Sequence, residues 1–205
     1  MTPSRWRGFL LLLLAGCATV RVEEARVITG LIRDPRGEPV AGTPVVLVAR
    51  VLELNLSNLG YDEKGRREIK TVTDAQGRYR LEVVPSQLGN NFYLFFYGEG
   101  FDAVQFKKPE SVELTNRLKE SRVVTVHRHF EWHPDWPEVQ RLIYQMGADS
   151  ERGRVLRQFG LPEKQEAIET GSGTSEVWHY FAKGVSYRFL NGRLVGVQEF
   201  TPIKD

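Results

Sequence analysis

Hydrophobic and polar positions follow a strand-like pattern through the first half of the chain. Between residues 26 and 132, short runs rich in valine, leucine and aromatic residues are separated by turn signals, for example at 34–37 and 74–77. Aspartate and proline favour the early positions of a turn, and glycine accepts a positive φ near its end. Seven or eight short strands without a helical period predict an antiparallel β-sandwich. The expected strands cover residues 27–32, 44–52, 68–73, 79–84, 92–97, 103–106 and 123–132.

After His133 the apolar residues recur at helical spacing instead. Two helices are expected, one at the capping-box pair Asp135 and Glu138 and one beginning after Ser150. Asn191-Gly192 is a strong hairpin signal between the last two apolar runs. The expected strands cover residues 177–181, 185–190 and 194–200, after a polar loop at 163–175. This half therefore predicts a small α+β domain with two helices and a three-stranded antiparallel sheet.

The beginning of the chain has the pattern of a processed leader. Arg5 and Arg7 precede an apolar run at 9–14, and small residues lead into Cys17, the single cysteine. The run is far shorter than the ~20 residues that a spanning helix needs. Residues 14–17, Leu-Ala-Gly-Cys, resemble the bacterial lipobox. The resemblance implies cleavage before Cys17, a diacylglyceryl thioether on its sulfur and a fatty acyl group such as palmitate on its new amine.

A location and a domain layout follow from this resemblance. Two or more acyl chains anchor stably, because each buried methylene contributes about 0.8 kcal/mol. Ala18, where an aspartate would imply inner-membrane retention, implies the outer membrane of a Gram-negative bacterium, with a periplasmic or a surface-facing orientation both open. The expected layout is a signal peptide at 1–16, a lipidated linker at 17–25, a β-sandwich at 26–133 and an α+β domain at 134–205.

Composition excludes several classes of function. The chain has 28 lysines and arginines and 26 acidic residues, so removing Arg5 and Arg7 with the leader leaves 26 of each sign. A balanced charge gives no electrostatic footprint for nucleic acid. With Cys17 lipidated, no disulfide can form. The 41% of hydrophobic residues is enough for ordinary hydrophobic cores.

Turn glycines and core apolar residues recur in a recognisable order in the first half. They are Gly30, Asp34, Gly37, Pro39, Val40, Gly42, Val45, Thr73, Asp74, Ala75, Gly77, Arg78, Tyr79, Leu81, Val84 and Pro85. This order resembles the carboxypeptidase regulatory-like domain, which implies a transthyretin-like sandwich of seven strands acting as a spacer or recognition module without catalytic residues. An insertion at 52–67 and a loop at 86–91 depart from the family, and both are expected as surface loops, where specificity often lies.

A second set of residues recurs in the last fifty positions. They are Arg154, Val155, Leu156, Phe159, Gly160, Pro162, Glu176, Trp178, Tyr180, Tyr187, Phe189, Asn191, Gly192 and Leu194. This spacing resembles the SmpA/OmlA (BamE-like) lipoproteins of the β-barrel assembly machine. The resemblance implies binding to partner proteins and lipid, with an outer-membrane barrel or its assembly factors as candidate partners. In that family the domain follows the lipid almost directly, whereas here about a hundred residues intervene.

Two aromatic groups each have two interpretations. Trp178, Tyr180, Tyr187 and Phe189 are candidate partner contacts, or they pack the sheet against the two helices. The dense aromatic run at 92–97 forms an exposed interface or sugar-binding face, or belongs to a central strand covered on both faces. For this run we expect the covered strand.

A histidine stripe is the candidate metal site. On one continuous strand, His127, His129, Glu131 and His133 would share a face, and histidines two apart can chelate one ion. The alternative, which we favour, is a solvated polar stripe. The sequence contains neither a His-Glu-x-x-His motif nor a Gly-x-Ser-x-Gly elbow, so we expect no catalytic residues and no cofactor beyond the lipid on Cys17.

The sequence therefore predicts a non-enzymatic, lipid-anchored envelope protein that tethers or scaffolds partner proteins at the outer membrane. The expected contact regions are residues 52–67, 86–91 and 163–175. One alternative is a lipoprotein that binds an envelope glycan or small ligand through its sandwich. Another is a metal-binding lipoprotein using His127, His129 and His133.

Overall fold

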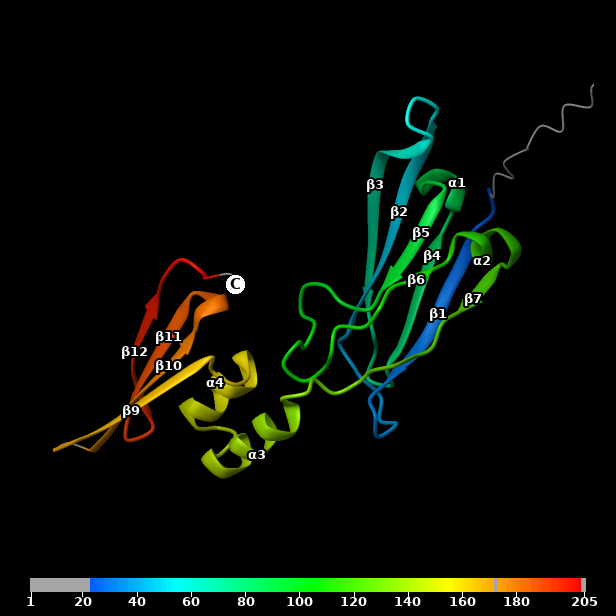
Figure 1. Ribbon diagram of the computed structural model, residues 1–205. Coiled ribbons are helices and arrows are strands. Elements are labelled where there is room, and N and C mark those ends of the chain that lie inside the picture. The colour runs from blue at the N-terminus through cyan, green and yellow to red at the C-terminus, as the bar shows by residue number, and fades with distance from the viewer. Residues whose placement is uncertain (1–22, 172, 204–205) are drawn as a thin grey trace, which may run out of the picture.

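The computed structural model describes residues 23–171 and 173–203. The lipobox and Cys17 lie outside these residues, so the predicted lipidation has no structural description. Within the described residues the fold is β-rich, with twelve strands in three four-stranded sheets, four α-helices and two hydrophobic cores (Figure 1). None of the helices in this part of the chain has the length and apolar character needed to cross a membrane.

Two of the sheets face each other across the first core and form the two-sheet unit. The first sheet contains β1 (Arg26–Arg33), β4 (Arg78–Val83), β7 (Val123–Thr125) and β8 (Arg128–His129). The second sheet contains β2 (Pro44–Asn55), β3 (Gly60–Val72), β5 (Asn91–Phe95) and β6 (Val112–Glu113). Alternate residues point inward, as the sequence pattern predicts, so that Ile28 and Ile32 of β1 share the core with Leu47 and Leu94.

The first sheet is not wholly antiparallel, which corrects the expectation of an antiparallel sandwich of seven strands. β7 and β8 pair in succession with β1, and both run parallel to it. Parallel pairing requires a crossover. Here the chain returns to the edge of β1 after passing through the second sheet and α2 (Thr115–Glu120). The chain therefore enters the two-sheet unit at Arg26 and leaves it near Trp132, at the opposite end (Figure 1).

Other boundaries also differ from the expectations. Residues 52–67 form the outer part of the β2–β3 hairpin rather than a loop, and α1 (Pro85–Leu88) occupies much of the loop expected at 86–91. Residues 103–106 form a turn rather than a strand, and its contacts with the segment leaving the two-sheet unit include a bridge from Phe106 to Trp132 and a hydrogen bond from the His133 N–H to the Gln105 carbonyl. The expected strand at 123–132 breaks at Val126 and His127, between β7 and β8.

The second core lies between two helices and the third sheet, and together they form the helix–sheet unit. The helices are α3 (Trp136–Met146) and α4 (Glu151–Phe159), which confirms the two predicted helices. Ser150 Oγ caps α4 by accepting from the Gly153 N–H, whereas the Asp135 side chain makes no capping hydrogen bond at α3. The 3₁₀ turn η1 (Phe181–Lys183) interrupts the strands that follow.

The third sheet has four strands rather than the expected three. Its order is β12 (Arg193–Glu199), β11 (Val185–Leu190), β10 (Gly173–Tyr180) and β9 (Lys164–Thr170). Every residue of β9 is exposed, so this strand carries none of the apolar alternation that reveals a half-buried strand. It is held by backbone pairing with β10.

Candidate functional site

The histidine stripe does not form the expected surface. Only Arg128 and His129 lie on β8, so the four polar residues do not share the face of one continuous strand. His133 turns toward the start of α3, where its Nδ1 accepts from the Asp135 N–H at 3.3 Å. Among residues 23–171 and 173–203, no group of three or more His, Cys, Asp or Glu side chains is placed to hold a metal ion. The structure therefore gives His127, His129 and His133 no common site.

The aromatics expected to contact a partner are mostly core residues. Trp178, Tyr180 and Phe189 are buried beneath the helices, and only Tyr187 is partly exposed. The Trp178 and Phe189 rings lie 4.9 Å apart, and the Tyr180 hydroxyl donates to the Gly160 carbonyl at 3.0 Å. Burial raises the pKa of Tyr180 above its ordinary value. In this structure the three side chains pack in the second core, the arrangement that the packing interpretation describes.

The aromatic run at 92–97 has an open face, contrary to the expected covered strand. Phe92, Leu94 and Phe96 point into the first core, while Tyr93, Phe95 and Tyr97 lie on the outer side of the second sheet and are half-buried. The described helices pack elsewhere: α1 and α2 direct Leu88 and Leu118 to the first core, and α3 and α4 belong to the second core. The alternation thus brings three rings to a surface.

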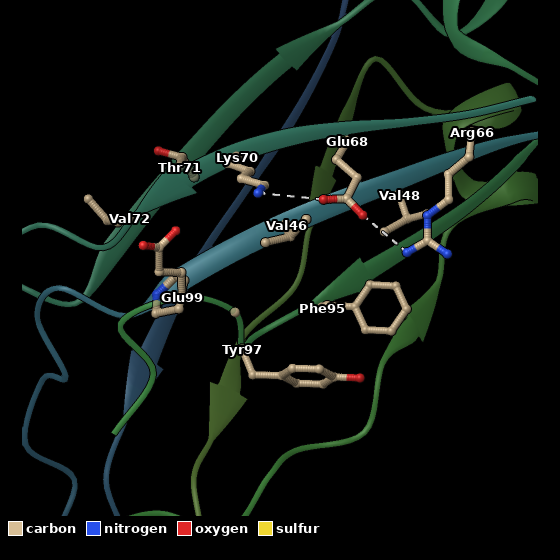
Figure 2. A pocket seen from close by; sticks show the side chains of 12 residues that line it. Val46, Val48, Arg66, Glu68, Lys70, Thr71, Val72, Phe95, Tyr97 and Glu99 are labelled. Carbon is tan, nitrogen blue, oxygen red and sulfur yellow. Dashed lines mark hydrogen bonds and ion pairs between the residues drawn. The ribbon is translucent and has the colours of Figure 1, made fainter. Parts of the chain in front are cut away.

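Two of these rings, Phe95 and Tyr97, line a groove of about 610 Å³ that we call the outer-face groove (Figure 2). Val46 and Val48 form part of its floor beside Phe95 and Tyr97. The full lining is Pro44, Val46, Val48, Arg66, Glu68, Lys70, Thr71, Val72, Phe95, Tyr97, Gly98 and Glu99. The groove therefore draws on three neighbouring strands, β3, β2 and β5, and on the turn that follows β5.

A ladder of alternating charges forms one wall of the outer-face groove. Arg66 Nη2 lies 3.1 Å from a carboxylate oxygen of Glu68, and Lys70 Nζ lies 3.6 Å from the other (Figure 2). On the floor, the Phe95 and Tyr97 rings meet edge to face at 5.5 Å, and Lys108 Nζ lies 4.2 Å from the Tyr97 ring centroid. The groove thus offers apolar contact, aromatic faces and charged hydrogen-bonding groups to a non-covalent ligand.

The predicted contact regions are ordered by different interactions, side-chain hydrogen bonds in one case and strand pairing in another. Asn90, in the expected loop at 86–91, clamps the β2–β3 hairpin: its Oδ1 accepts from the Leu52 N–H at 2.9 Å and its Nδ2 donates to the Leu52 carbonyl at 2.7 Å. The residues expected as a loop at 163–175 form most of the β9–β10 hairpin.

In the sequence, the alternation at 92–97 was the signal for the groove. Only the expectation that both faces of this strand are covered was wrong.

Comparisons with known proteins identify no family. No family model matches the chain, and no curated protein matches it. Among solved structures, similarity extends to GBS52, the minor pilin of Streptococcus agalactiae, at 16% identity over 55% of this chain and 47% of that one, with a TM-score of 0.32. A streptococcal ancillary pilin matches at 12% identity over 87% and 56%, with a TM-score of 0.35. Catechol 1,2-dioxygenase from Acinetobacter sp. ADP1 matches at 13% identity over 58% and 56%, with a TM-score of 0.33. The chain spans about half the length of these proteins.

Proposed function

We propose that this chain is a non-enzymatic, lipid-anchored envelope protein in which the two-sheet unit holds the helix–sheet unit away from the membrane. The observation that carries the proposal is the parallel pairing of β1 with β7 and β8. An anchor on Cys17 would lie at the end where β1 begins, and the helix–sheet unit follows from the other end. Ten residues from Val123 to Trp132, at strand spacing, separate the two ends by about 30 Å.

Contacts between the two units support a continuous arm rather than two independent units joined by a flexible linker. The Phe106 and Trp132 rings stack at 5.1 Å with an interplanar angle of 14°, and Trp132 lies 6.4 Å from Trp136 at the start of α3. From the other side, Arg157 of α4 lies over the Trp136 ring and 3.9 Å from the Asp102 carboxylate. Trp132 contributes to both hydrophobic cores.

The family assignments belong to this proposal. We place the two-sheet unit with the carboxypeptidase regulatory-like, transthyretin-like sandwiches and the helix–sheet unit with the SmpA/OmlA type. In support, Gly30 lies in a close backbone contact, and the aromatic residues of the Trp-x-Tyr and Phe-x-Asn-Gly patterns, Trp178, Tyr180 and Phe189, share one core. The partners would be other envelope proteins, with an outer-membrane barrel or its assembly factors as candidates.

In-cell photo-crosslinking tests the tether. A crosslinking amino acid at Val197, which is 52% exposed on the helix–sheet unit, should capture a discrete envelope protein. The same amino acid at Arg80, an exposed position on β4 of the two-sheet unit, is the matched control and should capture much less. Equal capture from both positions, or capture from neither, would contradict a displayed helix–sheet unit.

The open outer-face groove favours a second candidate function, binding of an envelope glycan or small ligand. Half-buried rings beside charged groups suit a sugar, which offers both apolar ring faces and hydroxyls. Titration with peptidoglycan fragments and outer-membrane polysaccharide should show binding that Tyr97→Ala weakens and Tyr144→Ala, on the exposed surface of α3, leaves unchanged. Binding that is equally insensitive to both substitutions would exclude the groove.

A further inference from the structure

The tip of the β2–β3 hairpin exposes an apolar, uncharged surface. Leu54, Leu56, Leu59 and Tyr61 are 57%, 76%, 84% and 72% exposed. No charged residue lies between Glu53 and Asp62 in the sequence. We call residues 54–61 the hairpin tip. Four large apolar side chains gathered on one projecting turn mark an interaction site rather than scattered surface hydrophobics.

The hairpin tip satisfies its own backbone polar groups with short side chains. Asn55 Oδ1 accepts from the Ser57 N–H at 3.0 Å, and Asn58 Oδ1 accepts from the Gly60 N–H at 2.9 Å. Leu59 occupies the left-handed region, with φ of 54°, and holds its side chain outward there. A turn closed internally in this way loses fewer water hydrogen bonds when it leaves water.

Charged pairs surround the base of the same hairpin. Lys64 Nζ lies 3.0 Å from the Asp62 carboxylate, and Arg50 Nε lies 3.5 Å from that of Glu63. An uncharged apolar tip above a ring of both charge signs matches the order of layers in a bilayer, where hydrocarbon lies beneath polar headgroups. Tyr61 stands at the boundary, the position that amphipathic aromatic side chains favour.

The hairpin tip projects from the end of the two-sheet unit at which the described chain begins. Arg26 pairs with Val83 at the end of β4, and α1 then connects to β5, where Asn91 pairs with Arg50. Beyond Arg50 the hairpin continues outward to its tip (Figure 1). The start of β1 and the base of the hairpin extension therefore lie at one end of the unit.

The hairpin extension and the segment that links β1 to Cys17 have similar maximum lengths. From Arg50 to Leu56 the hairpin advances six residues, or about 20 Å at strand spacing. Cys17 precedes Glu23, the first described residue, by six positions, and six residues span at most about 20 Å when extended. A lipid on Cys17 and the hairpin tip can therefore reach the same plane.

We propose that the hairpin tip enters the interfacial region of the bilayer that holds the Cys17 lipid, so that the two-sheet unit has two points of membrane contact. This inference rests on the proposed lipid anchoring. It names the occupant of the tip as a lipid surface. A second contact fixes the tilt of the arm, which a single flexible tether cannot do.

The test uses the full, lipidated chain reconstituted in vesicles of phosphatidylethanolamine and phosphatidylglycerol. Leu56→Cys carries an environment-sensitive nitrobenzoxadiazole probe, because lipidation leaves no other free thiol. We expect a blue shift, a several-fold rise in emission and quenching by nitroxides attached to the acyl chains. Val197→Cys, on the helix–sheet unit, is the matched control and should remain quenchable only from water.

The possible outcomes distinguish failure of tip insertion from failure of the lipid-anchoring proposal. If the protein floats with the vesicles and the probe at residue 56 stays in water, the tip does not enter the bilayer and the inference is overturned. A shielded probe that acyl-chain nitroxides do not quench would place the tip in a protein surface and overturn it equally. If the protein does not float at all, the anchoring proposal fails and the inference falls with it.

Replacing the tip leucines gives an independent readout. Leu56→Ser with Leu59→Asn should lower the protection from aqueous quencher of a probe attached at residue 54, and the lipid on Cys17 should still hold the protein on the vesicle. Val195→Ser with Val197→Ser, at similarly exposed positions of β12, is the matched control and should leave that protection unchanged. Equal protection in both double variants would contradict a role for the tip leucines.

Discussion

Gly30 lies where β1 meets the junction between β7 and β8, and this single position has no room for a side chain. A Cβ there would lie 1.8 Å from the Val126 carbonyl oxygen and 2.7 Å from its carbon. The obstacle is backbone, so it cannot rotate away. The Tyr79 hydroxyl donates to the same carbonyl at 2.7 Å, so one close contact organises both the strand junction and a buried phenol.

Gly30→Ala should therefore destabilise the two-sheet unit strongly. We expect a loss of about 3 kcal/mol or more in the free energy of unfolding, since the strands must separate or the junction must shift. Urea unfolding measures this loss. Gly65→Ala in β3 is the control, because its Cβ would meet only the Val51 side chain at 3.6 Å, and it should change stability by less than about 1 kcal/mol. Similar losses in both variants would refute the steric argument.

Leu59 is a residue that is unfavourable for the stability of the fold but favourable for the proposed membrane contact. A branched apolar side chain at φ of 54° is strained, whereas asparagine tolerates that region. Leu59→Asn should raise the free energy of unfolding by about 0.5–1 kcal/mol. Thermal unfolding checks this against Leu56→Asn, which carries no such strain and should be near neutral. A destabilising Leu59→Asn would show that the Leu59 side chain stabilises the fold by more than the backbone strain costs.

Tyr79 should give the two-sheet unit a dependence on alkaline pH. Burial raises the pKa of its phenol above the ordinary value of 10.0, with Arg117 opposing the shift only in part. Above pH 10 the unfolded chain releases this proton first, so the stability present below pH 10 declines as the pH rises. Tyr79→Phe should lose about 1 kcal/mol at neutral pH with the hydrogen bond, and should decline less between pH 10 and 11. Urea unfolding at pH 7, 10 and 11 compares the slopes, and parallel slopes would count against a buried, protonated phenol.

Secondary-structure elements differ in how far the sequence reveals them. β1 and α4 are visible because apolar residues alternate or recur on one buried face, and Ser150 supplies a true cap. β9 is hidden because all its residues are exposed, so only backbone pairing defines it. The β2–β3 extension is also not revealed by the sequence pattern, because its leucines are exposed and do not pack in a core.

The candidate site could be predicted only in part. The alternation at 92–97 placed three rings on a second face, but no pattern along one strand can say whether that face is covered. The histidine interpretation assumed a continuous strand, and the break between β7 and β8 lies at Val126 and His127. Trp178 and Phe189 could be assigned to the core only once the helices were seen to cover them.

At the level of the element, the hairpin extension should be dispensable for folding. The first core includes Val45, Leu47 and Ala49 but no residue between Arg50 and Arg67, and Ile69 packs against it from β3. Replacing residues 53–62 with an Asn-Gly turn should leave the free energy of unfolding within about 1 kcal/mol of the full chain, because little apolar area leaves a core. Circular dichroism and urea unfolding would show this, and collapse of the two-sheet unit would assign the extension a structural role.

The whole molecule is elongated: β1 begins at one end of the two-sheet unit, and the helix–sheet unit lies beyond the other end (Figure 1). The hairpin tip and the start of β1 share the first end, while the aromatic contacts around Trp132 connect the second. The outer-face groove lies on the side of the arm, between these ends. Under the proposed anchoring, the hairpin tip would be the membrane-proximal contact, the groove a lateral binding surface and the helix–sheet unit the distal part, each built from separate residues.

The account is tested most directly by measuring heights above the bilayer. Donor dyes at residue 56 and at residue 197 of the lipidated protein would transfer energy to acceptor lipids in supported vesicles. An upright arm predicts efficient transfer from residue 56 and weak transfer from residue 197, which should stand at least about 30 Å higher. Equal transfer from both positions would mean that the molecule lies flat on the membrane, and it would contradict the proposed display of the helix–sheet unit.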